Sequence, residues 1–130
     1  MEQKVECVLM SNLTKKDRSN IRSGINRAFS RSELRRKVLD NAVVYNVDPL
    51  RPRVKTWCRC ASCHKLEARS YMDVDHKAPK VPVHLTADDM SWETYIDACW
   101  CDISNLQALC EGCHSFKTKA ENKLRRSKKK

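Results

Sequence analysis

Two pairs of cysteines in this chain have the spacing of a metal site, one at Cys60 and Cys63 and the other at Cys110 and Cys113. Two thiolates separated by two residues can bind one ion without strain, and two such pairs complete the tetrahedral shell that zinc prefers. The sequence therefore predicts that these four cysteines hold a structural Zn²⁺ ion.

The spacing leaves alternatives open for the zinc ligands. Cys58 could replace Cys60, because a Cys-x4-Cys pair can also chelate, and His64 directly follows a zinc cysteine. Cys99 and Cys101 are separated by a single residue and form a poorer chelate. Redox chemistry at either CxxC pair is disfavoured, since no thioredoxin-like pattern of strands and helices surrounds it.

A second group of polar residues, Asp75, His76 and Asn105, lies between the cysteine pairs, and His114 follows the last cysteine. Side chains of neighbours such as Cys113 and His114 diverge by about 100° at a helix start, and neighbours on a strand point to opposite faces. We therefore expect Asp75 and His114 to bind one hard divalent cation, with His76 turned toward a water molecule. Phosphodiester hydrolysis needs such a cation and a base, and neutral histidine suits the base role near pH 7.

Charge is distributed unevenly along the 130 residues, whose net charge is +10. Residues 15–55 carry twelve Lys or Arg against four acids, residues 116–130 carry eight against one, and residues 66–106 carry three against eight. An acidic centre between basic flanks suits an enzyme that grips a polyanion while its centre binds a cation. The alternative is that these charges only keep a small protein soluble.

Eight cysteines could also indicate a disulfide-rich secreted protein. No export signal is visible in the sequence, and no apolar run approaches the length that spans a membrane. We therefore expect reduced cysteines, a cytoplasmic location and no membrane partner.

The remaining pattern predicts a small α+β domain with a basic helical hairpin before the cysteine module. Thr14 with Asp17 and Ser30 with Glu33 have the spacing of capping boxes, for helices near 15–28 and 31–43. The polar faces of these helices carry Arg27, Arg31 and Arg35, which could lie along a phosphate backbone. The other expected elements are an extended linker over 46–56, a strand over 69–75, a capped helix over 88–98, a return strand or loop over 102–109, and a helix from 114 onward.

Several of these residues stand in a string that resembles the HNH endonuclease family, in particular its small phage-type members with two CxxC pairs. The string reads Asp75-His76-x2-Pro79, followed by Asn105-Leu106-Gln107-Ala108-Leu109-Cys110-x2-Cys113-His114-x2-Lys117-Thr118. The resemblance covers about residues 57–122 and implies a ββα-metal fold. The long stretch over 77–104 departs from compact members and carries the additional helix, as a substrate-facing or capping insertion.

The resemblance implies roles for the individual residues. His76 would be the general base, Asp75 and His114 would bind the catalytic cation, and Asn105 would orient the loop of the base or approach the metal. Lys117 would face phosphate, with a solvated helix side chain as the equal alternative. Arg69 could brace the phosphate or form a surface salt bridge.

The expected protein is thus a phage-encoded, divalent-metal-dependent HNH endonuclease that nicks or cleaves DNA. It would have a basic helical region over 1–56, the nuclease module over 57–122 and a basic tail over 123–130. Mg²⁺, Mn²⁺, Ni²⁺ or Zn²⁺ could serve as catalytic metal beside the structural zinc. The expected partners are DNA and components of a DNA-packaging machine such as terminase, and the protein would be a monomer or weak dimer. The alternatives are a zinc-containing nucleic-acid binder that never cuts and a DNA-packaging accessory subunit.

Overall fold

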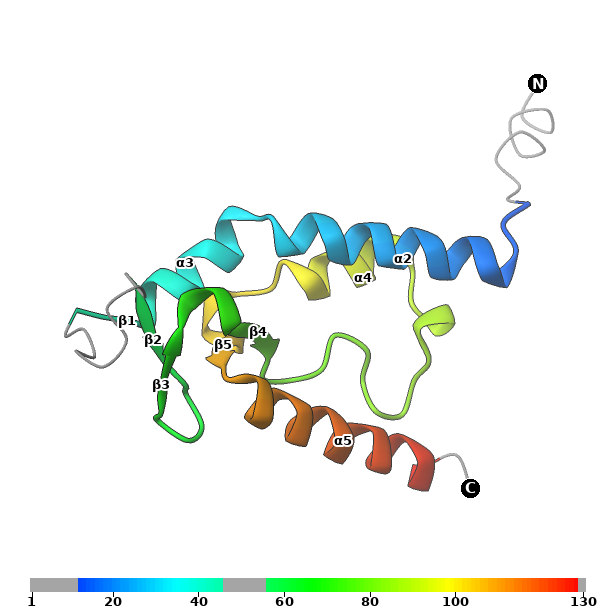
Figure 1. Cartoon of the computed structure of the whole chain (residues 1–130). Coiled ribbons are helices and arrows are strands. Elements are labelled where there is room, and N and C mark those ends of the chain that lie inside the picture. Colours follow the sequence, from blue (N-terminus) through cyan, green and yellow to red (C-terminus); the bar gives the residue numbers. More distant parts are fainter. Residues whose placement is uncertain (1–11, 46–55, 129–130) are drawn as a thin grey trace.

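The computed structural model of the chain describes residues 12–45 and 56–128 as a mixture of helices and small sheets (Figure 1). This confirms the mixed character of the predicted fold class. The α-helices within the described ranges are α2 (Lys15–Ser30), α3 (Glu33–Asn41), α4 (Trp92–Cys99) and α5 (Glu111–Lys128). The predicted linker lies outside these ranges except at its last residue, and so does Cys7.

The start of α2 is confirmed, whereas that predicted for α3 is wrong. Thr14 accepts a hydrogen bond from the backbone of Asp17 at 3.0 Å, and the Asp17 carboxylate accepts one from the Thr14 backbone at 3.1 Å. Helix α2 continues through Ser30, whose hydroxyl donates to the carbonyl of Arg27, so Ser30 cannot cap the next helix. The cap of α3 is Ser32, because the chain needs two residues after α2 to change direction.

Two antiparallel sheets form within the described ranges. One has the order β1 (Val43–Val44), β2 (Trp57–Arg59), β3 (Leu66–Ala68), and the other pairs β4 (Asp73–His76) with β5 (Leu106–Leu109). The predicted strand over 69–75 is too long at its start, since residues 69–71 form a 3₁₀ turn. Tyr71, which breaks the alternation of polar and apolar residues, lies in that turn and is exposed.

The segment between β4 and β5 contains the predicted additional helix, but the helix begins later than expected. Thr86 and Asp89 do form a capping box, yet it starts only the 3₁₀ turn η2 (Ala87–Asp89). Helix α4 follows after a second cap, in which the Ser91 hydroxyl accepts a hydrogen bond from the backbone of Thr94. The C-terminal helix also differs, because α5 begins at Glu111 and includes residues 123–128 of the predicted tail.

The core lies between helices α2, α3 and α4 and the strands β2 and β5. In Figure 1, α2 and α3 run along one side of the β4–β5 pair, α5 runs along the opposite side, and α4 packs beside α2. The buried apolar side chains include Phe29, Val38, Leu39, Met72, Tyr95, Leu106 and Leu109, and from α5 the partly buried Cys113 packs against them. No helix of residues 12–45 and 56–128 is long and apolar enough to cross a bilayer.

The side-chain oxygen of Asn26 joins α2 to the segment between β4 and β5. Its Oδ1 accepts hydrogen bonds from the Lys80 ammonium at 2.8 Å and the Tyr95 hydroxyl at 3.1 Å, and the Cys99 thiol approaches it at 3.8 Å. One amide oxygen thus ties α2 to α4 and to the loop before it. Part-buried donors that lose such an acceptor carry a desolvation penalty.

Replacing Asn26 by alanine should therefore lower the free energy of unfolding by about 2 kcal/mol, since Tyr95 and Lys80 lose their acceptor. Thermal or urea unfolding followed by circular dichroism measures the change. Asn20→Ala is the matched control, because Asn20 is an exposed residue of the same helix. Equal stabilities of the two variants would contradict a structural role for the Asn26 amide.

Candidate functional site

Four cysteines come together in the structure as the sequence predicted. The Sγ atoms of Cys60, Cys63, Cys110 and Cys113 all lie within 4.8 Å of one another, and those of Cys63 and Cys110 are 3.8 Å apart. Tetrahedral zinc with Zn–S bonds of about 2.3 Å requires sulfur separations of about 3.8 Å. The cluster therefore has the size and the donor atoms of a structural zinc site.

The first cysteine pair lies on a tight turn between β2 and β3. The backbone of Cys60 donates to the carbonyl of Lys65 at 2.9 Å, and that of His64 donates to the carbonyl of Cys60 at 3.0 Å. His64 has a φ of 64° and an exposed side chain. Cys58 is buried and its thiol approaches the carbonyl of Leu39 at 3.5 Å. The geometry thus assigns the ligand position to Cys60 and leaves Cys58 and His64 outside the cluster.

The pKa values of Cys60 and Cys113 are shifted in opposite directions. Burial raises the pKa of Cys60, but hydrogen bonds from the backbones of Cys110, Cys63 and Ser62 outweigh it and lower this pKa to about 6. Hydrogen bonds to the sulfurs of Cys110 and Cys63 raise the pKa of Cys113 to about 12. The cluster therefore already stabilises one thiolate, which is the form that binds zinc.

His76 ends β4 and is buried, with 8 % of its surface exposed. Its Nε2 lies 2.9 Å from the carbonyl oxygen of Cys99, the last residue of α4. A carbonyl can only accept, so Nε2 carries the proton of the neutral ring and Nδ1 keeps its lone pair. The ring of Phe29 packs against the imidazole at 5.3 Å between centroids. The segment predicted as an insertion thus supplies the group that orients His76.

The surroundings of His76 favour its neutral form. Burial lowers the pKa of this imidazole, and the ammonium groups of Lys80 and Lys117 lower it further. The hydrogen bond to Cys99 and the carboxylate of Asp75 oppose this change, but the pKa remains below its ordinary value. A neutral imidazole with a free Nδ1 can accept a proton.

The two residues predicted to bind one cation lie close together, Asp75 on β4 and His114 on α5. Asp75 is buried, and its Oδ1 lies 3.9 Å from Nε2 of His114. Two ligands at about 2.1 Å from one ion stand roughly 3–4 Å apart, so this pair is compatible with a shared metal. The other ring nitrogen, Nδ1, lies 3.3 Å from Oδ2 of Asp73. Asp73 was not singled out from the sequence, although residues two apart share one face of a strand.

Lys117 contacts the same carboxylate from α5. Its ammonium lies 3.2 Å from Oδ2 of Asp75 and donates to the carbonyl of His76 at 2.9 Å and to Glu121 at 3.1 Å. Gln107, which pairs with Asp75 across the sheet, donates to the same Oδ2 at 3.0 Å. Lys117 is thus a partly buried cation paired with Asp75 and Glu121, and it is not the solvated side chain considered as an alternative from the sequence.

Asn105 is the last residue of a 3₁₀ turn (Ile103–Asn105) directly before β5, and it contacts the loop that follows His76. Its Oδ1 accepts from the backbone of Ala78 at 2.9 Å, and its backbone carbonyl accepts from Lys77 at 2.7 Å. Its Nδ2 approaches the sulfur of Cys101 at 3.6 Å. Of the two roles considered for Asn105, these contacts fit the orientation of the loop.

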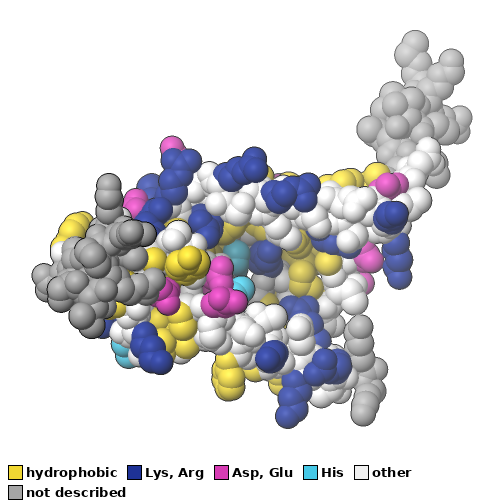
Figure 2. Space-filling view, viewed as in Figure 1, with side chains coloured by type: hydrophobic (Ala, Val, Ile, Leu, Met, Phe, Trp, Pro, Cys, Tyr) yellow, Lys and Arg dark blue, Asp and Glu magenta, His cyan; other side chains and the backbone are white. Residues whose placement is uncertain are grey.

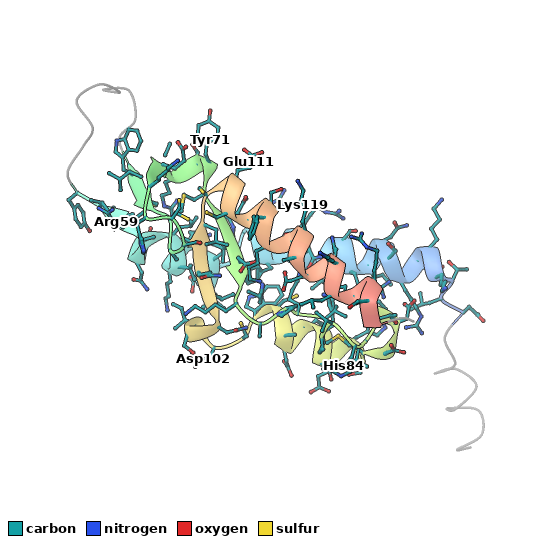
Figure 3. The ribbon with its side chains drawn as sticks, turned by 90° about the horizontal axis from the view of Figure 1, so that it is seen from below. Arg59, Tyr71, His84, Asp102, Glu111 and Lys119 are labelled. Carbon is teal, nitrogen blue, oxygen red and sulfur yellow. The ribbon has the colours of Figure 1, made fainter. Side chains whose placement is uncertain are left out.

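Four of these residues, Asp73, Asp75, His76 and His114, line one cleft of about 680 Å³. Figure 2 shows acidic and histidine side chains in the hollow between the layer of α2 and α3 and the layer of α5, with Lys and Arg on both sides. Figure 3 shows the underside, where α5 crosses the molecule with Glu111 at its first turn and Lys119 near its middle.

The basic residues singled out from the sequence lie in different settings around this cleft. Arg35 lines it, whereas Arg27 and Arg31 are exposed near the junction of α2 and α3. Arg69 forms an ion pair with Asp40 at 2.9 Å, which is the salt bridge considered as its alternative.

Two further cations line the cleft and were not singled out from the sequence, namely Lys80 and Arg125. They are held by neutral oxygens, Lys80 by Asn26 and Arg125 by the carbonyl of Val81 at 2.7 Å. The groups that fix these side chains therefore leave their positive charge uncompensated. No motif marks either residue, since only the packing of the loop against α2 and α5 brings them to the cleft.

Comparison of the chain with protein-family models, with curated proteins and with solved structures found no match.

Loss of one cluster cysteine should remove the bound metal and destabilise the fold by several kcal/mol, because binding of a structural zinc is linked to folding. We expect one zinc per wild-type chain and much less in Cys63→Ser, with a lower melting temperature. Elemental analysis and circular dichroism measure both. Cys101→Ser is the control, since Cys101 lies outside the cluster. Wild-type zinc content and melting temperature in Cys63→Ser would contradict the assignment.

Removing the Lys117 ammonium should destabilise the protein by about 2 kcal/mol, because the buried Asp75 carboxylate loses its cationic partner. Lys119→Ala removes the same charge from an exposed position of α5 and should leave stability nearly unchanged (Figure 3). Chemical denaturation of Lys117→Ala and Lys119→Ala at one ionic strength makes the comparison. Equal stabilities would show that Lys117 is an ordinary surface residue.

Proposed function

We propose that the protein is a divalent-metal-dependent DNA endonuclease of the HNH kind. The observation that carries the proposal is the meeting of His76, Asp75 and His114 in one cleft. The order β4, β5, α5 corresponds to the two strands and helix of a ββα-metal module. The zinc cluster joins the β2–β3 turn to the start of α5 and supports that arrangement from outside the cleft.

His76 is the general base of the proposed reaction. Its Nε2 proton is engaged by the Cys99 carbonyl, so its Nδ1 is the nitrogen that takes a proton from water. Burial and the neighbouring ammonium groups lower the pKa of the imidazole, which keeps this nitrogen unprotonated near neutral pH. Asn105 holds the backbone of the following loop and thereby limits the movement of the base.

Asp75 and His114 would hold the divalent cation through Oδ1 and Nε2. When bound, the cation would neutralise the scissile phosphate and the leaving 3′ oxygen. One carboxylate and one imidazole suit Mg²⁺ and Mn²⁺ as well as softer ions such as Ni²⁺ and Zn²⁺. The Lys117 ammonium and the Gln107 amide orient the carboxylate through its other oxygen.

A nucleic-acid backbone is the substrate that fits the charges around the cleft. Arg35, Lys80 and Arg125 line it, and the surface of α2, α3 and α5 is rich in Lys and Arg (Figure 2). Cations distributed along both walls of a cleft can follow a chain of phosphates. Contacts of this kind determine affinity and position and carry no base sequence.

Cleavage of supercoiled plasmid tests the proposal. Wild type should produce nicked or linear DNA with Mg²⁺, Mn²⁺ or Ni²⁺ and none in EDTA, and His76→Ala should lose at least about 100-fold of the rate, as expected for removal of a general base. His84→Ala is the matched control, because His84 is an exposed histidine of the same segment (Figure 3).

The proposal fails if His76→Ala and wild type cleave equally. Asp75→Asn should lose metal-dependent cleavage of DNA. Its zinc content and circular dichroism spectrum should equal those of the wild type, which would show that the variant is folded. A wild-type protein that binds DNA at low salt and cuts nothing with any of these metals would be a zinc-containing binding protein instead.

A further inference from the structure

The imidazole of His114 lies between two carboxylates of the same strand face. Nδ1 lies 3.3 Å from Oδ2 of Asp73, and Nε2 lies 3.9 Å from Oδ1 of Asp75. Asp73 is the more accessible of the two, with 44 % of its side chain exposed against 8 % for Asp75. The two acids therefore have different surroundings although they are two residues apart.

We propose that Asp73 is a positioning residue, whose carboxylate accepts the Nδ1 proton of His114 and so fixes the tautomer that directs the Nε2 lone pair toward Asp75. This inference rests on the proposed function, since it concerns the same cation. A carboxylate behind a metal-binding histidine fixes the ring and raises its basicity as a ligand.

The groups around Asp75 determine which of its two carboxylate oxygens is left to bind a cation. Its Oδ2 is engaged by the Gln107 amide and the Lys117 ammonium, so Oδ1 is the oxygen left to a cation. The Lys117 ammonium is also held by the carboxylate of Glu121 at 3.1 Å. One ligand atom on Asp75 and one on His114 are thus selected by groups that do not bind the ion themselves.

The same contacts predict opposite tautomers for the two buried or half-buried histidines. His76 Nε2 lies 2.9 Å from the Cys99 carbonyl oxygen, to which it donates, and His114 Nδ1 lies 3.3 Å from the Asp73 carboxylate, to which we propose that it donates. The exposed His64 and His84 provide reference signals in the same protein. Long-range ¹H–¹⁵N correlation spectra of neutral imidazoles distinguish the two forms, in zinc-loaded protein without the second metal.

The spectra of wild type should show His114 protonated at Nδ1 and His76 protonated at Nε2. Asp73→Ala should return His114 toward the mixture shown by the exposed histidines, with no change at His76. An Nε2-protonated His114 in the wild type would overturn the proposal. This readout requires neither the catalytic metal nor cleavage.

Metal affinity provides the second readout, with Mn²⁺ as the probe in calorimetric titrations of the zinc-loaded protein. Asp73→Ala should weaken Mn²⁺ binding about 10- to 100-fold, which is the usual effect of losing such a support. Asp73→Asn removes the same charge but keeps an oxygen that accepts the Nδ1 proton, so it should retain most of the affinity. Asp97→Ala, at an exposed position of α4, controls for the loss of one negative charge.

Equal weakening by Asp73→Ala and Asp73→Asn would overturn the proposal, because Asp73 would then act as a direct ligand or through its charge alone. A wild type without measurable Mn²⁺ affinity, or full affinity in Asp73→Ala, would also overturn it. The outcome is separable from the nuclease itself. If the tautomers and Mn²⁺ affinities are as expected but the wild type cleaves no DNA, the positioning role of Asp73 stands and the nuclease proposal is refuted. If the wild type cleaves DNA but Asp73→Ala and Asp73→Asn bind Mn²⁺ equally, the nuclease proposal stands and the positioning role is refuted.

Discussion

The pairing of β4 with β5 is the interaction on which the candidate site depends. It sets Asp75 opposite Gln107 and His76 opposite Leu106, although about thirty residues separate the partners along the chain. Helix α5 begins two residues after β5, so this register also fixes His114 and Lys117 relative to Asp75. A slip of one residue would reverse the faces of β4 and separate Asp75 from α5.

The four-cysteine cluster lies outside the cleft and connects the segments on either side of this strand pair. Cys60 and Cys63 lie on the β2–β3 turn, and Cys110 and Cys113 flank the start of α5. The backbone of Ala61 also donates to the carbonyl of Ala108 in β5 at 2.9 Å. A small domain has limited apolar surface to bury, so a metal held by these four cysteines would add stability by joining two distant segments.

The segment between β4 and β5 has a structural task at the site. Its helix α4 ends at the Cys99 carbonyl that holds His76, and Asn26 of α2 holds Tyr95 of the same helix. Helices α2 and α4 and the imidazole of His76 are therefore connected by hydrogen bonds between segments far apart in sequence. The position of His76 depends on helix α2 as well as on the strands and helix around it.

The sequence by itself determined the four clustered cysteines and the first helix cap, because both depend on the spacing of a few neighbouring residues. It also placed Asp75, His76 and His114 as candidates, but spacing could not indicate Asp73 or Gln107 as their supports. Those contacts, the paired state of Lys117 and the approach of Lys80 and Arg125 to the cleft were decided by tertiary structure alone. They arise from strand register and helix packing between distant segments, which local sequence patterns do not encode.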